Sequence, residues 1–394
     1  MIEILRLDHQ GRGIAKVNDK IIFIPKVLPG EIVEYKIIND KKNYMEGQVT
    51  KIIKNSPQRI IPKCKYYDVC GGCNLMHMSY QNQLIYKQEK IENIINKYVN
   101  EKVDIKPIIA SENEINYRNK ITIHADKHIG LYQENSNKLI KIDECLLADK
   151  RINRIIKELY NKYLYRDEFV IRVGEKETLF YYQNPKNNLE DISADNIALN
   201  NKIIKGKNYI IEALNDLKYK ISPSSFFQVN TKQAIKMYEI IKQIVNSKKS
   251  DKIIDLYCGT GSIGLFLNNE CNSILGIEIN KDAVKDANDN MLLNNIKNAR
   301  FIAGDAKRVI KEISFNPDIL IVDPPRSGLF KGMIDDIYIF NPLTIIYVSC
   351  DPLTLARDLN ILKEKYCIKM IQPIDLFPNT HHVESICILE RRTV

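Results

Sequence analysis

Two residues near the end of the chain have the side-chain types that covalent catalysis requires. Cys350 follows the apolar run TIIYVS and precedes an Asp-Pro turn, so its thiol should lie at the carboxyl end of a strand. A thiolate is a strong nucleophile, and its surroundings set its pKa. Glu384 begins the run ESICILE; if that strand is antiparallel, its carboxylate reaches the same edge as a general base. The plainer interpretation, an inert packed thiol, is the one we give to Cys258, Cys271, Cys367 and Cys387.

A glycine-rich turn in the same half of the chain predicts a cofactor site. Gly259, Gly261 and Gly264 form a GxGxxG pattern between the apolar run DKIIDLYC and the helix-like SIGLFLNN. Glycine lets the backbone turn tightly and approach a ligand closely. Glu278 ends the next apolar run, where its carboxylate can accept hydrogen bonds from both hydroxyls of a ribose. A nicotinamide dinucleotide and S-adenosylmethionine both satisfy this much.

Three carboxylates favour S-adenosylmethionine. Asp255 precedes the glycine turn and suits the charged methionine end, Asp305 in GDA can reach the adenine amino group, and Asp323 in DPPR ends the fourth strand. In doubly wound sheets, ligands bind outside the carboxyl ends of the strands. We therefore expect a single crevice that is bordered by Tyr257, Glu278, Asp323 and Cys350.

A cluster of cysteines in the first half of the chain predicts a metal site. Cys64, Cys70 and Cys73 lie close together, the last two around a Gly-Gly pair, and Cys145 follows in DECLLA. The nine cysteines are an odd number in a chain without an export signal, so a disulfide framework is not expected. Four thiolates can hold either zinc or an iron–sulfur cluster, and the spacing leaves that choice open.

The remaining patterns divide the chain into three parts. Residues 1–58 alternate short β-rich runs with turn signals, as a small RNA-holding barrel does. Residues 59–222 carry the cysteines, a helical periodicity over 81–99 and several strand-like runs such as KITIHA, DEFVIRV and TLFYYQ. Residues 223–394 alternate an amphipathic helix and further helices with apolar strands, which predicts a parallel sheet covered on both faces.

Composition and charge limit the class of protein. The 394 residues are enough for two or three domains, and 44% hydrophobic content is ordinary for a globular protein. The net charge of +9 suits a polyanion such as RNA, although a solvated basic surface would account for it as well. No apolar run reaches the length of about 18 residues that a membrane span needs, and the amino terminus is not a signal peptide. We expect a cytoplasmic monomer.

Taken together, these residues resemble the bacterial 23S rRNA (uracil-5-)-methyltransferase family over essentially the whole chain. The likeness is carried by a C-x5-C-G-G-C motif at Cys64 to Cys73 and by SPSSFFQVN, DLYCGTGSIG, GIEIN, DPPRSGL, SCDPLTLARDL and THHVES. It implies a TRAM barrel, a central α+β domain with a 4Fe–4S cluster and a Rossmann-like class I methyltransferase domain. It also implies that the helix at 81–99 packs on the last of these.

The resemblance assigns a role to each candidate residue. Cys350 would add to carbon 6 of a uridine, carbon 5 would accept the methyl group, and Glu384 would remove the carbon 5 proton. Independently of the resemblance, we predict that the target base is flipped out of the RNA, where aromatic residues such as Phe226 and Phe227 could stack on it. The expected cluster ligands are Cys64, Cys70, Cys73 and Cys145, and the expected contacts to S-adenosylmethionine are Gln228, Tyr257, Gly259, Gly261, Ser262, Glu278, Asp305 and Asp323.

Several alternatives stay open. The tRNA-specific branch usually lacks the barrel and the cysteines, so we expect 23S rRNA as the partner and keep a tRNA uridine as the second choice. An amino-group methyltransferase would use DPPR like the NPPY-type loops and would not need Cys350. A redox-sensing RNA-binding protein with an inert methyltransferase fold, or a nicotinamide dehydrogenase, leaves more of the motifs unexplained.

Overall fold

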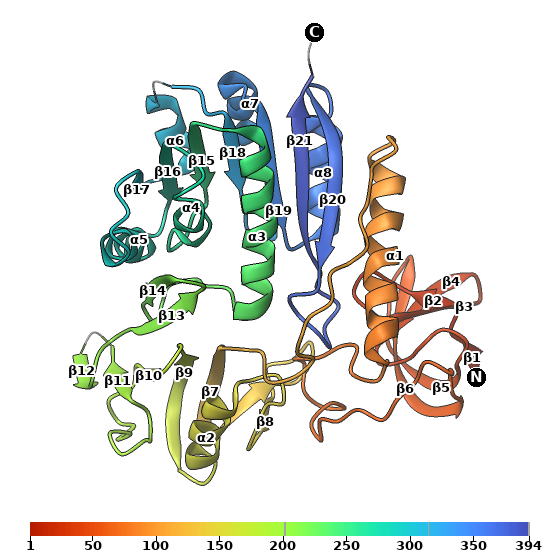
Figure 1. The fold of residues 1–394 in the computed structure, drawn as a ribbon. Coiled ribbons are helices and arrows are strands. Elements are labelled where there is room, and N and C mark those ends of the chain that lie inside the picture. The colour runs from red at the N-terminus through yellow and green to blue at the C-terminus, as the bar shows by residue number, and fades with distance from the viewer. Residues whose placement is uncertain (201, 314, 393–394) are drawn as a thin grey trace.

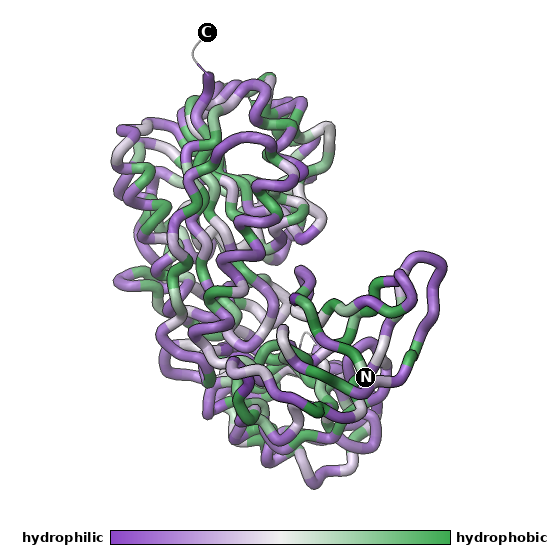
Figure 2. The backbone as a smooth tube through the Cα atoms, turned by 90° about the vertical axis from the view of Figure 1, so that its right-hand side faces the viewer, coloured by the Kyte–Doolittle hydropathy of each residue, from purple (hydrophilic) through white to green (hydrophobic). Residues whose placement is uncertain are grey.

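The computed structural model describes residues 1–200, 202–313 and 315–392, which fold into three bodies (Figure 1). The N-terminal barrel and a central α+β body occupy one end of the molecule, and the C-terminal α/β body occupies the other. Seen from the side, the barrel projects next to the central body, while the catalytic body lies at the opposite end of the molecule (Figure 2). In the described part of the chain, no helix is both long and apolar enough to cross a bilayer.

The N-terminal body is a closed barrel. β1 pairs with β5 and β2 pairs with β3, and because β1 and β2 are consecutive pieces of one extended segment, the sheet closes on itself. Ile4, Ile22, Ile24 and Val33 are fully buried inside it. The strands are β1 (Ile2–Glu3), β2 (Arg6–Leu7), β3 (Gly13–Val17), β4 (Lys20–Ile24), β5 (Ile32–Asp40) and β6 (Tyr44–Lys54).

The central body is a six-stranded sheet covered by one helix. The helix α2 (Lys150–Leu159) buries Ile152, Ile155, Ile156 and Leu159 against the sheet, as its period of three to four residues requires. A separate hairpin follows, made of β13 (Ile210–Leu214) and β14 (Leu217–Ile221). The strands of the main sheet are β7 (Lys120–Tyr132), β8 (Leu139–Lys141), β9 (Leu164–Val173), β10 (Thr178–Tyr182), β11 (Asn196–Leu199) and β12 (Lys202–Lys205).

The C-terminal body contains a seven-stranded sheet in the order β17-β16-β15-β18-β19-β21-β20. Its first five strands are parallel, and β21 runs antiparallel between β19 and β20. The strand order reverses next to β15, which places the ligand crevice outside the carboxyl ends of β15 and β18. The strands are β15 (Lys252–Leu256), β16 (Ser273–Glu278), β17 (Ala299–Ala303), β18 (Ile319–Val322), β19 (Thr344–Ser349), β20 (Tyr366–Ile374) and β21 (Glu384–Arg391).

Helices cover both faces of this sheet, as the apolar strands predicted. Neighbouring strand residues point to opposite faces, so Ile253 joins one buried cluster and Ile254 the other. The first face packs on α3 (Thr231–Lys248), α4 (Ser262–Phe266) and α5 (Lys281–Leu293). The second packs on α6 (Ala306–Val309), which continues into the 3-10 helix η1 (Ile310–Glu312), on α7 (Lys331–Phe340) and on α8 (Pro352–Leu362).

One segment from the first half of the chain joins the C-terminal body. The helix α1 (Tyr80–Tyr98) packs beside α8 and buries Ile91, Ile94 and Ile95 in the second cluster. After α1, Ile105 and Ile109 pair with β20 through isolated parallel bridges. The C-terminal body is therefore discontinuous in sequence, and its edge next to β20 is formed by residues near position 100.

Candidate active site

Cys350 and Glu384 come together at one edge of the catalytic sheet. In the antiparallel pairing of β19 with β21, Ser349 lies opposite Ser385, so the next residues are Cys350 and Glu384 on the two strand ends. Asp323 directly follows β18, the other neighbour of β19. β21 is therefore antiparallel to β19, which is the condition under which Glu384 was expected to reach the same edge as Cys350.

The charges around Cys350 strongly favour its protonated form. Burial and, after it, the carboxylates of Glu384 and Asp323 raise the pKa of Cys350 to about 12, while Arg326 opposes them. Burial and Asp323 hold the pKa of Glu384 well above its usual value. Burial alone raises the pKa of Asp323 to about 7. A thiol, two carboxyls and a guanidinium therefore share a single electrostatic environment, which is typical of catalytic sites.

Arg326 is the cation of this group, because the neighbouring histidines are neutral. The Arg326 guanidinium lies 3.2 Å from Nε2 of His382, whose ring is 4.1 Å from the ring of His381. Burial, the second histidine and Arg326 lower the pKa of His382 to about 2, and burial and Lys90 lower that of His381 to about 4. Near neutral pH, positive charge at the thiol thus comes from Arg326.

The backbone of the glycine turn after β15 is left-handed at three positions and leaves room for a ligand beside it. Tyr257, Gly259 and Gly261 all have positive φ, of 64°, 54° and 75°. A Cβ on Gly261 would come within 2.7 Å of the Phe301 ring, so packing as well as φ requires glycine there. At Gly259 nothing lies within 4 Å of the Cβ position, so a ligand can approach the backbone.

Two carboxylates flank this turn, and one of them has a free oxygen. Oδ2 of the fully buried Asp255 accepts from Gly264 N at 3.1 Å, whereas its Oδ1 has no partner among the described residues. Burial and Asp323 raise the pKa of Asp255 to about 8. Glu278 accepts from Gly259 N at 3.1 Å. A buried acceptor without a hydrogen-bond partner is rare unless a ligand donates to it. The ammonium group of S-adenosylmethionine is a donor that suits Oδ1 of Asp255.

Two other expected cofactor residues, Asp305 and Ser262, follow strands of the same sheet, and Gln228 lies in the loop between β14 and α3. Asp305 is exposed at the N-cap of α6. Burial of Tyr257 and, as the second cause, the negative charge of Asp305 raise the pKa of Tyr257 to about 12. The Ser262 hydroxyl begins α4 and lies 2.9 Å from the hydroxyl of Tyr238. Gln228 is buried, and its backbone carbonyl accepts a hydrogen bond from the Asn119 side chain at 3.1 Å.

The loop that precedes Gln228 is held by two residues that sequence reasoning missed. Arg172 of β9 is 1% exposed and donates to the carbonyls of Pro223 and Ser225. Asp286 of α5 accepts from the Ser225 hydroxyl at 2.7 Å, so the loop is tied to both the central and the catalytic body. The sequence signal that could have identified Arg172 is its position as a charged residue in the apolar run FVIRV. A charged residue in a strand is, however, usually expected to face solvent.

The two phenylalanines of this loop differ in their exposure to solvent. Phe226 is 65% exposed and free to stack on a base. Phe227 is 3% exposed and packs against Tyr219 in the core, with ring centroids 5.8 Å apart. The expectation that Phe227 also stacks on a flipped base is wrong, because adjacent side chains in an extended segment point in opposite directions.

The structure brings the four cysteines of the predicted cluster to one cavity. Cys64, Cys70, Cys73 and Cys145 line a cavity of about 400 Å³ together with Arg118. Burial raises the pKa of Cys73 above the normal range, and the other three thiols raise it further. In the described part of the chain, no group of three or more His, Cys, Asp or Glu is arranged to hold a metal ion.

Comparison with known proteins matches both ends of the chain. The profile of the tRNA (Uracil-5-)-methyltransferase family matches residues 182–392, and that of the TRAM domain matches residues 1–50. An uncharacterized RNA methyltransferase of Oceanobacillus iheyensis is 34% identical over 97% of this chain and 94% of that protein. One of Bacteroides thetaiotaomicron is 32% identical over 97% of this chain and 99% of its own length.

A solved structure resembles the entire molecule. The tRNA (uracil-54, C5)-methyltransferase of Pyrococcus abyssi, in complex with S-adenosyl-L-homocysteine, has a TM-score of 0.76 and 27% identity. The likeness covers 99% of this chain and 100% of that one. The likeness therefore includes the TRAM barrel and the central sheet as well as the class I methyltransferase fold of the catalytic body. The chain belongs to the tRNA (uracil-5-)-methyltransferase family and is an S-adenosylmethionine-dependent RNA methyltransferase.

Proposed function

We propose that this enzyme methylates carbon 5 of a uridine through a covalent bond between Cys350 and carbon 6. The observation that carries the proposal is the pairing of β19 with β21, which sets a thiol and a buried carboxyl at adjacent strand ends beside Asp323. Carbon 5 of uracil is too weak a nucleophile to take a methyl group unaided. A methyltransferase that acts on an amino group needs no such thiol.

Addition of the thiolate activates the ring. The sulfur of Cys350 donates an electron pair to carbon 6, and the electrons of the carbon 5–carbon 6 double bond move onto the carbon 4 oxygen. Arg326 stabilises the thiolate against the two carboxyls that raise its pKa. Asp323 borders both the uracil edge and the methyl donor. Carbon 5 then carries the electron density that the methyl group requires.

Removal of a proton completes the reaction. S-adenosylmethionine, when bound, would supply the methyl group to carbon 5 and would leave as S-adenosylhomocysteine when its bond from sulfur to the methyl carbon breaks. Glu384 takes the proton from carbon 5, the double bond reforms, and the bond between carbon 6 and Cys350 breaks with return of the thiolate. Contacts to the methyl donor come from Gln228, Tyr257, Gly259, Gly261, Ser262, Glu278, Asp305 and Asp323.

We propose further that Cys64, Cys70, Cys73 and Cys145 hold a 4Fe–4S cluster. A tetrahedral zinc site with Zn–S bonds of about 2.3 Å would draw its sulfurs to about 3.8 Å from one another. A 4Fe–4S cluster is larger than a single ion, and the roomy cavity that the four thiols border supports the cluster. No step above needs an electron, so the cluster is assigned a structural role.

The RNA substrate has two candidates. The cysteines favour 23S rRNA, because their motif resembles that of the family of ribosomal enzymes, whereas the barrel does not distinguish the two RNAs. A tRNA uridine is the second candidate, because the Pyrococcus abyssi tRNA enzyme corresponds to 99% of this chain, including the barrel. The target uridine is flipped out of its stack, at a cost of about a few kcal/mol, and stacks on Phe226.

Product analysis tests this function. Unmodified 23S rRNA and tRNA transcripts are incubated with the enzyme and methyl-labelled donor, then digested to nucleosides. The expected product is 5-methyluridine from one of the two RNAs, and Cys350→Ala should abolish it. Label on a base amino group, with full activity in Cys350→Ala, would overturn the proposal.

A further inference from the structure

The loop that leads into Glu384 connects β20 to β21 and contains residues 375–383. Glu384 is the first residue of β21 and pairs with Ile374, the last residue of β20, so this loop closes directly over the base. Asn379 at its tip has a φ of 67°, a left-handed conformation that must be held by its surroundings. The position of the Glu384 carboxyl therefore depends on what holds this loop.

Side chains from one face of α1 hold the loop at three successive places. Lys87 donates to Asp375 at 2.6 Å and to the carbonyl of Phe377 at 3.0 Å. Both members of this ion pair are fully buried. Tyr80, a further α1 residue, donates to the second oxygen of Asp375 at 3.0 Å.

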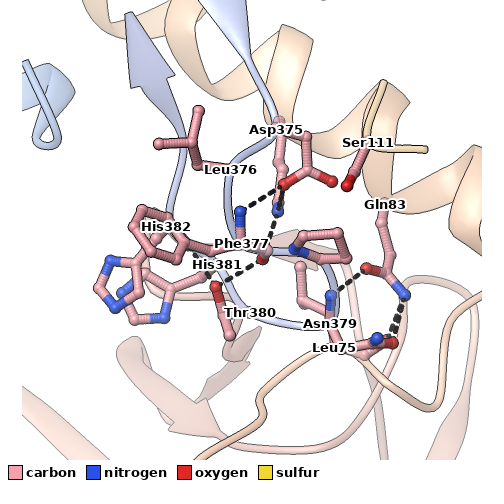
Figure 3. Close-up of polar contacts among 12 residues, drawn as sticks. Leu75, Gln83, Ser111, Asp375, Leu376, Phe377, Asn379, Thr380, His381 and His382 are labelled. Carbon is pink, nitrogen blue, oxygen red and sulfur yellow. Dashed lines mark hydrogen bonds and ion pairs between the residues drawn. The ribbon is translucent and has the colours of Figure 1, made fainter. Parts of the chain in front are cut away.

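The contact at the tip of the loop is made by Gln83. Its Oε1 accepts from the backbone N of Asn379 at 2.8 Å, and its Nε2 donates to the Asn379 side chain at 3.2 Å and to Leu75 O at 3.2 Å (Figure 3). Lys90, the next polar residue on this helix face, donates to His381 O at 2.8 Å. Gln83, Lys87 and Lys90 thus span the loop from its first residue to the histidines beside Glu384.

These polar residues interrupt the buried stripe of α1. Lys87 lies between Leu84 and Ile91 at helical spacing, where an apolar side chain would be the simplest way to pack the helix. Replacing a buried ion pair by apolar residues is often neutral or stabilising, so stability alone does not explain this pair. A requirement for one fixed loop geometry does explain it.

The nucleophile does not share this support. Cys350 follows β19, which lies inside the sheet between β18 and β21. Lys87, Lys90 and Oε1 of Gln83 contact the β20–β21 loop, and none of the helix contacts described above is made to Cys350. Loosening these contacts to the loop is therefore expected to displace the base more than Cys350.

We propose that Gln83, Lys87 and Lys90 are positioning residues that set the geometry of the general base Glu384; this inference rests on the function proposed above. They act through the β20–β21 loop and not by touching the RNA. Their loss slows the removal of the carbon 5 proton more than the addition of Cys350. The methylated covalent intermediate then accumulates, a signature that a merely structural defect does not produce.

The test uses Lys90→Met in the full-length enzyme, because Lys90 is half-buried and its removal leaves no buried carboxylate unpaired. The variant should melt and bind the methyl donor as the wild type does. With uridine RNA, kcat should fall by about 10-fold to 100-fold, since a misplacement of about 1 Å can cost that much. A denaturant-stable, methylated protein–RNA adduct should build up, as it should in Glu384→Gln.

Three further variants make the result specific. Gln83→Leu should behave like Lys90→Met, and Lys90→Arg, which keeps a donor, should restore turnover. Lys97→Met makes the same charge change on α1 at an exposed side chain that lies over the Tyr98 ring, and it should act like the wild type. Wild-type turnover without adduct in Lys90→Met and Gln83→Leu would overturn the inference.

A second RNA separates this inference from the function on which it rests. RNA with 5-fluorouridine has no carbon 5 proton to remove, so Lys90→Met should trap it as fast as the wild type does. Slow trapping by Lys90→Met alone would overturn the inference, because the loop would then support Cys350 or RNA binding. Absence of trapping by the wild type would instead overturn the covalent mechanism.

Discussion

Cys350 lies in surroundings that keep its thiol protonated until substrate is bound. Burial, Glu384 and Asp323 raise its pKa, and Arg326 is the cation that lowers it. Burial raises the pKa of Asp323 to about 7, and burial together with Asp323 holds the pKa of Glu384 well above its usual value. The resting thiol is therefore poorly reactive, and Arg326 sets how readily it ionises.

Neutralising the base should make the thiol more acidic. In Glu384→Gln the nearest negative charge is gone, the thiolate is stabilised, and the pKa of Cys350 falls below its present value of about 12. Alkylation of Cys350 at pH 8 should then be faster than in the wild type, and in Arg326→Met it should be slower. Mass spectrometry of the Cys350 peptide measures both rates. Equal rates in all three proteins would contradict this electrostatic account.

The carboxyl near the methyl donor gives the second prediction at this scale. Burial raises the pKa of Asp255 to about 8, so the free protein holds it largely protonated at pH 7. Binding an ammonium to its free oxygen requires the charged form, so affinity for S-adenosylhomocysteine should rise as pH increases from 6.5 to 8.5. Calorimetry at several pH values measures this, with Asp255→Asn as the control that flattens the profile. Affinity that falls with pH in the wild type would contradict the role of Asp255.

At the level of elements, alternating apolar strands and helices predicted the parallel sheet, and the glycine pattern predicted the turn after β15. Local patterns determine these elements, because strand and helix periods follow from which faces are buried. The helix after the turn ends earlier than its sequence pattern indicated, at Phe266 instead of running through Asn269. The contacts of Arg172 with the loop before Gln228, and of Lys87 with Asp375, could not be predicted, because no local period relates residues that far apart in the chain.

A side chain at Gly261 should destroy the donor site. Gly261→Ala combines a left-handed backbone with a 2.7 Å approach to Phe301, so the turn must move. The dissociation constant for S-adenosylhomocysteine should rise by about tenfold or more, as about 1.4 kcal/mol corresponds to tenfold. Gly30→Ala is the matched control, because its φ is 79° in a barrel turn with open space around it. Unchanged affinity in Gly261→Ala would refute the assigned turn.

The cysteine segment should affect catalysis through the same loop that holds Glu384. Immediately after Cys73, Asn74 and Leu75 donate their backbone N–H groups to Asn379 O at 3.1 and 3.0 Å. Cys73→Ser should remove the iron and expose the β20–β21 loop to proteolysis, without changing affinity for S-adenosylhomocysteine. Iron analysis and limited proteolysis measure this, with Cys271→Ser as the control. An iron-free protein with a fully protected loop would contradict the structural role of the cluster.

On the scale of the whole molecule, the barrel is tied to the catalytic body through α1. Tyr86 of α1 donates to Asp8 O of the barrel at 2.8 Å, while Lys90 of the same helix reaches the active-site loop. Turn signals and apolar runs predicted the barrel strands, but the place of the barrel depends on side chains of α1 that carry no local signature. The barrel and the catalytic body are thereby joined through one helix that lies between them (Figure 1).

The barrel should contribute phosphate contacts to RNA binding. Lys36, Lys51 and Lys54 are exposed on β5 and β6, and replacing all three by Gln should lower affinity and reduce the salt dependence. Each lost contact to single-stranded RNA changes the slope of log K against log salt by about 0.7. The control is Lys297→Gln, because the exposed Lys297 precedes the edge strand β17, which lies on the side of the molecule away from the barrel (Figure 1). An unchanged slope in the triple variant would exclude this surface.

The most direct test of the account is trapping on RNA in which 5-fluorouridine replaces uridine. Fluorine cannot leave carbon 5 as a proton, so the wild-type enzyme with S-adenosylmethionine should form one stable adduct whose modified peptide contains Cys350. Cys350→Ala should form none. An adduct on another residue, or no adduct from an enzyme that methylates uridine normally, would contradict the covalent mechanism.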